Sequence, residues 1–420
     1  MKALIITYYW PPAGGSGVQR WLYFVKYLRE FGIEPVVFTV ENPNYPIQDS
    51  SLKGHIPEDI EIIRQKIFEP NTFFGKKNLQ TGAGFLQQKP SFFQKTLQYI
   101  RANFFIPDAR KFWIKPSVRT LSKYLQKNKV DWFITTGPPH SVHLIGKKLK
   151  ERTDIKWLAD FRDPWTDIDY FHLLPLTARS LQKHEALEDS VISTADMVSV
   201  VSKTMLDRYI SKNKNCFNVP NGFDGEIVDQ QIPLDKKFTL THVGSLNADR
   251  NPNMFWKAIR AIIDENPNFE EKIQINIIGI VANEVLESID AYELGKYVNC
   301  IDYIPHDEVF SHMKKSQVLL LFLNNVPSAK GIVTGKVYEY LKAKRPILAM
   351  APINGDLAEI IERTNAGKVT DFNELDALKK NLYIYFDSYI ARKLIINSKN
   401  IQKYHRKNLT AQLAELLKNN

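Results

Sequence analysis

The stretch ALIITYYWPPAGGSGVQRWLYFVKYL, residues 3–28, decides the fold of this chain. Its first part, Ala3–Tyr8, is apolar and β-rich, as expected of a buried strand, and Tyr9–Gly17 is a loop of glycine and proline. Apolar residues then recur with the spacing of one buried helix face, at Val18, Trp21, Leu22, Val25 and Leu28. A second apolar run, Pro35–Val40, completes a predicted βαβ unit.

The same alternation of strands and helices continues along the chain in two series. The first series has predicted strands at 132–136, 157–160, 197–201 and 217–220. The second has them at 238–243, 273–278, 300–303, 318–322 and 347–349. We therefore predict an α/β fold of two Rossmann-like βαβ domains that face a central cleft. The expected divisions are an N-terminal domain at 1–221, a linker at 222–237, a C-terminal domain at 238–393 and a helical segment at 394–420 that packs on either domain.

Length and composition support two soluble domains. The chain has 420 residues, a length that exceeds what one hydrophobic core usually supports. Hydrophobic residues make up 44% of it and charged residues 24%, as in ordinary folded proteins. Its apolar runs are far shorter than the ~20 residues of a membrane-spanning helix. The first residues lack the pattern of a signal peptide, and two cysteines are too few for a disulfide framework. We expect a cytoplasmic protein.

Positive charge is concentrated in residues 65–129. Thirteen Lys or Arg and two acidic residues give this basic insertion a charge of +11, against +10 for the whole chain. Apolar side chains at Phe93, Leu97, Ile100 and Phe104 form a helical stripe, and the segment Arg110–Lys115 that follows contains three cations and two aromatic residues. Such a surface suits an anionic membrane leaflet. Alternatively, the aromatic residues belong to the core and the cations to a solvated face. We expect no nucleic-acid partner, since no recognised binding module accompanies the charge.

The loop Pro11–Gly17 brings backbone N–H groups to the start of a helix, where the helix dipole favours an anion or a sugar hydroxyl. We interpret Gly14, Gly15 and Gly17 as a substrate-binding glycine loop. A dinucleotide fingerprint would need glycine at Arg20. The alternative is a tight turn between strand and helix.

Two stretches of the second domain suit a nucleotide diphosphate. Gly244 follows a strand and permits close approach to a phosphate, while Arg250 offers a forked set of donors. Further on, Thr334 is a candidate helix cap, and Gly335 and Lys336 would meet the diphosphate. Ribose hydroxyls would donate to Glu339, one turn later on the helix. The alternative is an ordinary capped surface helix with an exposed glutamate.

Taken in order, these motifs resemble family 4 glycosyltransferases of the GT-B fold. The resemblance covers nearly the whole chain and includes the glycine loop, the turn Pro220–Asp224, the Gly244-to-Arg250 spacing and the Glu339 helix followed by Arg345–Ile347. It implies retaining transfer of a sugar from a nucleotide diphosphate sugar to an acceptor hydroxyl, in cell-surface polysaccharide or glycolipid assembly. It also implies no metal or other cofactor. The expected partners are a nucleotide-sugar and a glycan or lipid-linked acceptor, with peripheral contact to the inner face of the cytoplasmic membrane.

The chain departs from the family pattern at two positions of the donor site. Gly331 stands where the first glutamate of a two-glutamate motif is usual, and Ser245 replaces an arginine after the glycine. The residues expected to bind the donor are Gly15, Gly244, Ser245, Arg250, Lys330, Gly331, Thr334, Gly335, Lys336 and Glu339.

In the first domain, Asp160–Trp165 closes a strand where relatives carry a His-Asp pair, and Arg162 and Asp163 occupy those positions. Asp160 and Asp163 would bind sugar or acceptor hydroxyls, or offset positive charge on the anomeric carbon. A structural Arg–Asp cluster is the alternative. The catalytic candidates are therefore Asp160, Arg162, Asp163, Arg250 and Lys336, and the acceptor-side candidates are Gly14, Gly17 and His140.

We predict no metal site. The triplet Asp167–Asp169 is of a kind common by chance, and His140 and His143 have no carboxylate or third histidine at ligand spacing. Two other functions stay open. One is a sugar-nucleotide epimerase of the same fold, because fold does not determine function. The other is a catalytically degenerate, donor-binding or scaffold protein, suggested by Gly331.

Overall fold

The computed structural model describes residues 1–45, 47–69, 92–227, 232–302, 304 and 306–420. The chain divides into two compact units. Unit 1 comprises Met1–Asp224 together with Tyr404–Asn420, and unit 2 comprises Gly225–Lys403. Among the described residues each unit holds one parallel sheet, of seven strands in unit 1 and six in unit 2. The predicted α/β class with two Rossmann-like domains is confirmed.

Unit 1 has the strand order β3-β2-β1-β4-β5-β6-β7. Its strands are β1 Lys2–Thr7, β2 Glu34–Val40, β3 Glu61–Gln65, β4 Trp132–Gly137, β5 Lys156–Phe161, β6 Met197–Val200 and β7 Cys216–Asn218. Its α-helices are α1 Ser16–Leu28, α2 Phe92–Phe104, α3 Ile114–Lys127, α4 Ser141–Lys150, α5 Ala178–Thr194, α6 Lys203–Tyr209 and α14 Arg406–Asn419. Shorter 3₁₀ turns include η2 Ser50–His55 and η5 Lys111–Trp113.

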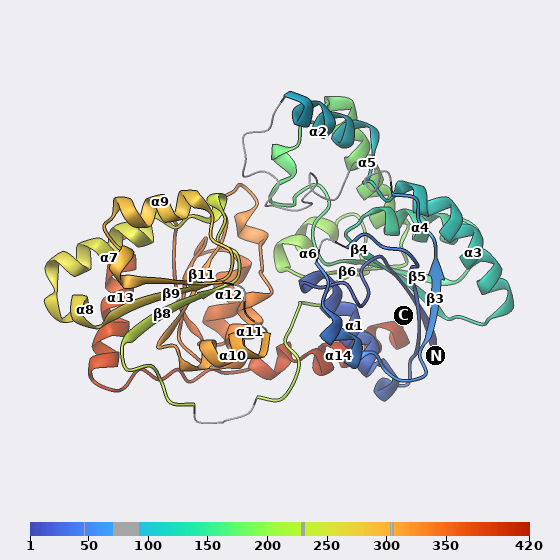
Figure 1. Ribbon diagram of the computed structural model, residues 1–420. Coiled ribbons are helices and arrows are strands. Elements are labelled where there is room, and N and C mark those ends of the chain that lie inside the picture. Colours follow the sequence, from blue (N-terminus) through green and yellow to red (C-terminus); the bar gives the residue numbers. More distant parts are fainter. Residues whose placement is uncertain (46, 70–91, 228–231, 303, 305) are drawn as a thin grey trace. The chain divides into compact units, whose positions relative to one another are not determined.

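The helices of unit 1 pack in two groups. The C-terminal helix α14, red in Figure 1, lies against the blue α1, and α4 packs against both α3 and α5. The predicted apolar face of α1 is confirmed, since all five of its predicted positions are buried. Together with the fully buried strand β1, this face forms part of one continuous hydrophobic core. Each large apolar side chain buried in it stabilises the unit by about 1.5–3 kcal/mol.

Unit 2 has the strand order β10-β9-β8-β11-β12-β13. Its strands are β8 Phe238–Val243, β9 Ile273–Ile278, β10 Val298–Ile301, β11 Val318–Phe322, β12 Ile347–Met350 and β13 Gly367–Thr370. Its α-helices are α7 Asn253–Glu265, α8 Pro267–Lys272, α9 Asn283–Ala291, α10 His306–Lys315, α11 Lys336–Ala343, α12 Asp356–Arg363 and α13 Leu375–Ile390. The 3₁₀ turns η7 Ala248–Arg250 and η9 Ala329–Gly331 follow β8 and β11.

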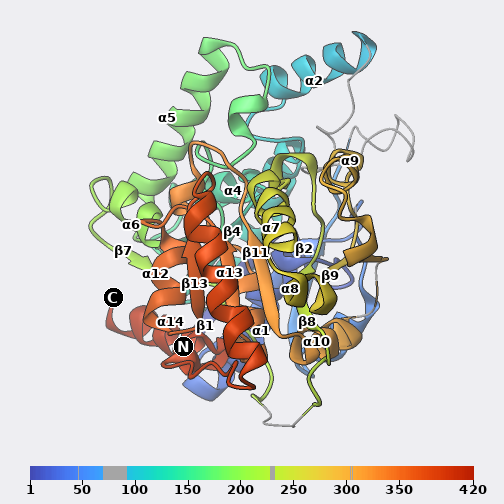
Figure 2. The ribbon, with the colours of Figure 1, turned by 90° about the vertical axis from the view of Figure 1, so that its left-hand side faces the viewer.

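Helices cover both faces of the unit 2 sheet. The yellow α7 and the red α13 lie side by side in Figures 1 and 2, and α10 and α11 contact each other. The second hydrophobic core includes apolar side chains of β8, β9 and β11 and the inner faces of α7 and α13. Strands buried on both faces need nearly continuous apolar sequence, which explains why β11 was predictable, whereas β8 and β9 alternate apolar with polar residues.

Two features of the sequence prediction need correction. The apolar pattern does not predict the edge strands β3 and β13, whose residues are mostly half-buried. The helix expected from Leu394 is wrong, because the chain is irregular to Asn400 and α14 begins only at Arg406. Backbone groups of this irregular stretch bond to the end of α12 instead, since Lys399 N–H donates to the carbonyl oxygen of Thr364.

The basic insertion lies partly outside the described residues, since residues 70–91 are not among them. Its described part contains α2, η5 and α3. The aromatic residues of the insertion are divided between the core and the surface. Trp113 is fully buried, whereas Phe104 and Phe112 are 64% and 42% exposed. Among the described residues no helix is long and apolar enough to cross a membrane.

Both sheets have one point at which the strand order reverses. In unit 1 it lies between β1 and β4, and in unit 2 between β8 and β11. Ligands of open α/β sheets bind beyond the carboxyl ends of the strands at such switch points. Functional side chains are therefore expected at these two places.

Candidate functional site

The switch point of unit 2 is bordered by the loops that follow β8 and β11. The guanidinium of Arg250 joins them: its Nε donates to Oδ1 of Asn324 at 2.9 Å, and its Nη1 donates to the carbonyl oxygen of Ser245 at 3.4 Å. The first bond reaches across the reversal in strand order. Arg250 is therefore placed at this switch point, as a phosphate-binding cation requires.

Gly244 lies directly after β8 with a φ of +98°, a conformation that side chains other than glycine rarely adopt. A Cβ at this position would come within 2.6 Å of Cε and 2.8 Å of Nζ of Lys336. The side chain of Lys336 therefore lies across Gly244. The absence of a side chain at residue 244 is what admits the ammonium group to this place.

The ammonium group of Lys336 is held in unfavourable surroundings. Burial, together with the positive charge of Arg250, lowers its pKa to about 7. Two cations brought together in this way repel one another, and an anion between or beside them would relieve the repulsion. The pair is suited to bind a group such as a diphosphate.

The helix α11 begins beside these cations. Its N-cap is Gly335, which supplies no capping side chain, and the N–H of Lys336 donates to Oγ1 of Thr334 at 3.4 Å. The expectation that Thr334 is the cap residue is thus corrected by one position. Tyr340 secures the helix to the sheet, because its hydroxyl accepts from Val243 N–H and donates to the carbonyl oxygen of Leu320, both at 3.1 Å.

The remaining donor-site candidates of unit 2 lie on α11 and on the 3₁₀ turn that precedes it. Glu339 is half-buried on α11, one turn after the helix start. Lys330 is exposed and Gly331 half-buried, both on η9 between β11 and α11. Their roles in donor binding stay predictions.

Sequence reasoning missed His242 and Asn324 in this cluster. His242 is fully buried on β8, and its Nε2 lies 3.4 Å from Nζ of Lys336. Asn324 is 5% exposed and receives the Arg250 hydrogen bond. A titratable residue near the carboxyl end of a buried strand was the available signal for His242. Asn324 had no such signal, because its hydrogen bond with Arg250 forms only in the folded chain.

At the switch point of unit 1, Asp160 is the centre of a buried network. Arg20 forms an ion pair with it at 2.8 Å, and Trp21 Nε1 donates to it at 2.7 Å. Hydroxyls of two residues at the same sheet register also donate, Thr136 at 2.9 Å and Ser199 at 2.6 Å. Burial raises the pKa of Asp160, but Arg20 and these hydrogen bonds outweigh burial and leave that pKa below its usual value.

This arrangement resembles the structural cluster given as the alternative for Asp160, although its cation is Arg20 rather than Arg162. Arg20 also donates to the carbonyl oxygen of Pro220 at 3.0 Å and to Oδ1 of Asn221 at 3.2 Å. It therefore ties α1 to the turn that begins at Pro220. Asp160 is 0% exposed, so any effect of its carboxylate on a ligand would be indirect.

Arg162 joins the two loops beside the same switch point. Its guanidinium donates to the carbonyl oxygens of Gly17 and Pro138, and it lies 5.3 Å from the centre of the Tyr9 ring. Burial lowers the pKa of Arg162. The buried guanidinium of Arg162 thus holds the end of the predicted glycine loop in place.

The glycine loop itself presents open backbone at one point. Gly14 N–H is bonded to the carbonyl oxygen of Ile47 at 2.9 Å. Gly15 has a φ of +86°, is exposed, and precedes α1 without a capping side chain. N–H groups at the first turn of a helix lack helical partners. The loop therefore keeps the geometry expected of a substrate-binding turn, and its function stays a prediction.

His140 lies after β4 and is 8% exposed. Its ring stacks on that of Trp165, with centroids 4.6 Å apart, and its Nδ1 has no hydrogen-bond partner among the described residues. Burial lowers the pKa of His140 well below the ordinary value, so the ring is neutral. A neutral imidazole can exchange a hydrogen bond with a hydroxyl, although Nδ1 of His140 is itself buried.

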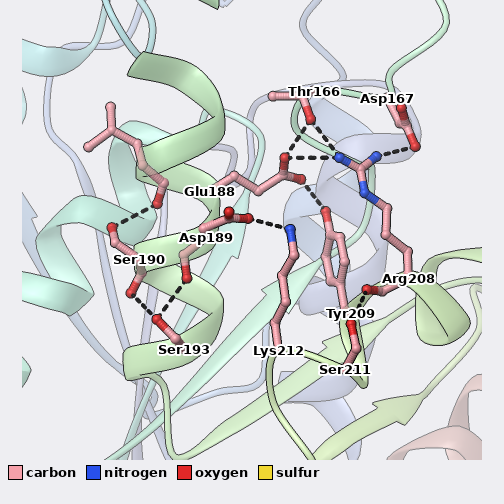
Figure 3. A network of polar contacts seen from close by, with 11 residues as sticks. Thr166, Asp167, Glu188, Asp189, Ser190, Ser193, Arg208, Tyr209, Ser211 and Lys212 are labelled. Carbon is pink, nitrogen blue, oxygen red and sulfur yellow. Dashed lines mark hydrogen bonds and ion pairs between the residues drawn. The ribbon is translucent and has the colours of Figure 1, made fainter. Parts of the chain in front are cut away.

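Asp163 is exposed on the loop that follows β5. The rest of this loop is clamped by the polar network of Figure 3. Glu188 of α5, 1% exposed, accepts from Thr166 Oγ1 at 2.5 Å and from the hydroxyl of Tyr209, while Arg208 pairs with Asp167. These contacts hold the loop that carries the exposed carboxylate of Asp163.

The triplet Asp167–Asp169 gains no metal-binding character from this geometry, since Asp167 is paired with Arg208. Within the described ranges no group of three or more His, Cys, Asp or Glu side chains is arranged to hold a metal ion. Metal independence stays an expectation.

The chain is similar in fold to solved structures, but sequence comparison assigns it to no family. No protein-family model matches the chain. No curated protein has a significantly similar sequence.

Solved structures do match over the full length. Sucrose-phosphate synthase from Thermosynechococcus elongatus is 16% identical, with a TM-score of 0.61, over 100% of this chain and 98% of that one. A mutant of S. aureus TarM in complex with Fondaparinux, alpha-GlcNAc-glycerol and UDP is 12% identical, with a TM-score of 0.58 over 99% of each chain. UDP-GlcNAc 2-epimerase from Methanocaldococcus jannaschii is 13% identical, with a TM-score of 0.53 over 100% of each chain. At such identities the likeness establishes the fold, which is GT-B.

Proposed function

We propose that this protein is a glycosyltransferase that moves a sugar from a nucleotide diphosphate sugar to an acceptor hydroxyl. The observation that carries the proposal is the pairing of Lys336 and Arg250 beside Gly244 at the switch point of unit 2. Fold likeness to sucrose-phosphate synthase and TarM supports the same reaction class. Retention of anomeric configuration, independence of metal and a role in cell-surface polysaccharide or glycolipid assembly are parts of the proposal that rest on the family 4 resemblance.

In this reaction negative charge grows on the diphosphate as the glycosidic bond breaks. Lys336 and Arg250 would stabilise that charge together with the first N–H groups of α11. Gly244 lets the diphosphate approach the backbone, and Glu339 would accept from the ribose hydroxyls. The departing phosphate would take the proton of the acceptor hydroxyl, so the reaction needs no protein base.

Unit 1 offers groups suited to an acceptor. The open turn at Gly15 stays a predicted donor contact, whereas the neutral ring of His140 and the exposed carboxylate of Asp163 lie beyond the carboxyl ends of unit 1 strands. Each of these two side chains can exchange hydrogen bonds with sugar hydroxyls. We assign acceptor recognition to them, with Arg162 holding the two loops in place.

A sugar-nucleotide epimerase is the second candidate, favoured by the fold likeness to the UDP-GlcNAc 2-epimerase. A donor-binding protein without catalysis is the third, favoured by Gly331. The decisive experiment begins with thermal shifts against UDP-, GDP-, dTDP- and CMP-sugars. The stabilising sugar is then incubated with the protein alone and followed by NMR. We expect an unchanged sugar or slow hydrolysis, whereas an isomerised sugar would overturn transfer in favour of epimerisation. No shift with any of the four would contradict the donor site.

We further propose peripheral contact with an anionic membrane, made by the described part of the basic insertion. The rings of Phe68 and Phe112 meet edge to face at 5.8 Å, and Phe105 contacts Phe112 at 6.1 Å. Lys111 lies over Phe105 and Phe112 and donates to the carbonyl oxygen of Phe104 at 2.5 Å. Exposed aromatic rings beside cations suit a leaflet of anionic lipids.

Sedimentation with vesicles tests this contact. We expect wild-type protein to bind vesicles of phosphatidylglycerol and phosphatidylcholine, and to bind vesicles of phosphatidylcholine alone more weakly. The double variant F104S/F112S should lose this binding, whereas Leu181→Ser, at a similarly exposed apolar residue of α5, should retain it. Equal binding of both variants would contradict the assignment.

A further inference from the structure

His242 is a buried polar side chain whose two ring nitrogens have different partners. It is 0% exposed on β8, and its ring stacks on that of Phe322 with centroids 5.4 Å apart. Its Nδ1 lies 3.2 Å from the carbonyl oxygen of Leu320 on the neighbouring strand β11. A carbonyl oxygen can only accept, so Nδ1 carries the proton.

This hydrogen bond determines what Nε2 can do. Burial, together with the charges of Lys336 and Arg250, lowers the pKa of His242 well below its ordinary value and outweighs the backbone contacts with Leu320 and Ser245 that raise it, so the ring is neutral. A neutral ring protonated at Nδ1 has a bare lone pair on Nε2. That lone pair is 3.4 Å from Nζ of Lys336, an ammonium group that can only donate.

Lys336 is constrained on its other sides as well. Its stem crosses Gly244, where a Cβ would come within 2.6 Å, and its α11 backbone is tied to β8 and β11 through Tyr340. The titratable and charged groups around it are His242 on β8, Arg250 at the end of η7 and, one turn along α11, Glu339. Of these, His242 accepts from the ammonium at a known atom.

We propose that His242 is a positioning residue that holds the Lys336 ammonium group beside Gly244, where it meets the diphosphate of the donor. The proposal rests on the function proposed above for this site. His242 acts through Lys336, and no contact with the ligand is required of it. The carbonyl oxygen of Leu320 keeps the proton on Nδ1, so Nε2 is left as the acceptor for Lys336. The position of the Lys336 ammonium group is therefore determined by two neighbouring strands of the sheet.

The first test needs no ligand. The pH midpoint of Lys336 is measured by NMR on protein labelled with ¹³Cε-lysine, with the signal assigned through Lys336→Arg. Removal of a hydrogen bond to a charged group disfavours the charged form, so His242→Phe should lower the midpoint by about one pH unit. His242→Gln, whose amide oxygen can accept and whose NH₂ can donate to Leu320, should return it toward the wild-type value. An unchanged midpoint in His242→Phe would overturn the proposal.

The second test measures UDP and uridine binding by calorimetry at pH 6.5. His242→Phe should weaken UDP binding about tenfold and leave uridine unchanged, because only UDP carries the diphosphate. Equal losses for both ligands would show a merely structural role and would also overturn the proposal. If wild-type protein binds none of the nucleoside diphosphates, the donor site fails, while the lysine midpoint still decides the position of Lys336. His242→Gln supplies a second folded variant should His242→Phe not fold.

Discussion

The two switch points of this protein have the same topology and opposite electrostatics. At that of unit 1, Arg20 is 4% exposed and is paired with the carboxylate of Asp160. At that of unit 2, Lys336 has Arg250 as its charged neighbour and a neutral histidine as its hydrogen-bond acceptor. One cation is compensated within the protein, and the other is held beside a second cation.

This difference separates a structural function from a binding function. A buried ion pair is destabilised when one member is removed, because the other is left as an uncompensated charge. A pair of neighbouring cations destabilises its own unit, and an anionic ligand restores the balance. The same fold position therefore holds unit 1 together and, in the proposed function, gives unit 2 its ligand-binding cations.

The largest expected effect concerns the structural side of this comparison. Asp160→Ala should lower the free energy of unfolding of unit 1 by about 4 kcal/mol, because Arg20 would stay buried without its partner. Hydrogen exchange in the strands of unit 1 measures this separately from unit 2. The double variant R20M/D160L should recover much of the loss. A single-variant loss below about 1 kcal/mol would contradict the structural assignment.

The next effect concerns the binding side. Lys336→Met should weaken UDP binding about 30-fold, since a charged hydrogen bond to phosphate is lost. The same change should raise the stability of unit 2, because it removes a buried cation beside Arg250. Calorimetry and thermal unfolding measure the two quantities. Lys342→Met, at the other end of α11, is the matched control and should leave UDP binding unchanged.

A smaller effect is expected at Gly244. Gly244→Ala should lower the free energy of unfolding of unit 2 by roughly 1–2 kcal/mol, because alanine is strained at positive φ, and should weaken UDP binding through displacement of Lys336. Denaturant unfolding and calorimetry report the two effects. Gly295→Ala, where the nearest side-chain atom is 3.7 Å from the added carbon, should be tolerated. If Gly244→Ala binds UDP normally, Lys336 does not need this opening.

The smallest effect is the pH dependence of the unmodified protein. The pKa of Lys336 is lowered to about 7, so above pH 7 the ligand-free ammonium loses its proton and UDP binding should weaken about tenfold per pH unit. Without ligand, the folded protein binds fewer protons at Lys336 than the unfolded chain between pH 7 and the ordinary lysine pKa of 10.5. The stability of unit 2 contributed by this group should therefore rise with pH across that window. UDP affinity that is flat from pH 7 to 8 would contradict the neutral-lysine interpretation.

The fold was largely predictable from sequence. Central strands such as β1, β11 and β12 are buried on both faces, and burial on both faces demands nearly continuous apolar residues. The edge strands β3 and β13 lack this demand, since they are only half-buried. The true start of the last helix was missed because basic, helix-compatible residues from Leu394 onward form backbone bonds elsewhere in the folded chain.

The site was predictable only where its members are close in sequence. Gly244, Gly335 and Lys336 follow strands or open helices, and the local pattern was enough to single them out. Pairing across long separations was not accessible: Arg20 meets Asp160 across 140 positions, and Lys336 meets His242 across 94. Local periodicity and glycine placement encode the two α/β domains and the loops that border their switch points, so both can be predicted from the residues alone. Which cation is compensated and which is held beside another cation depends on neighbours that only the folded chain brings together.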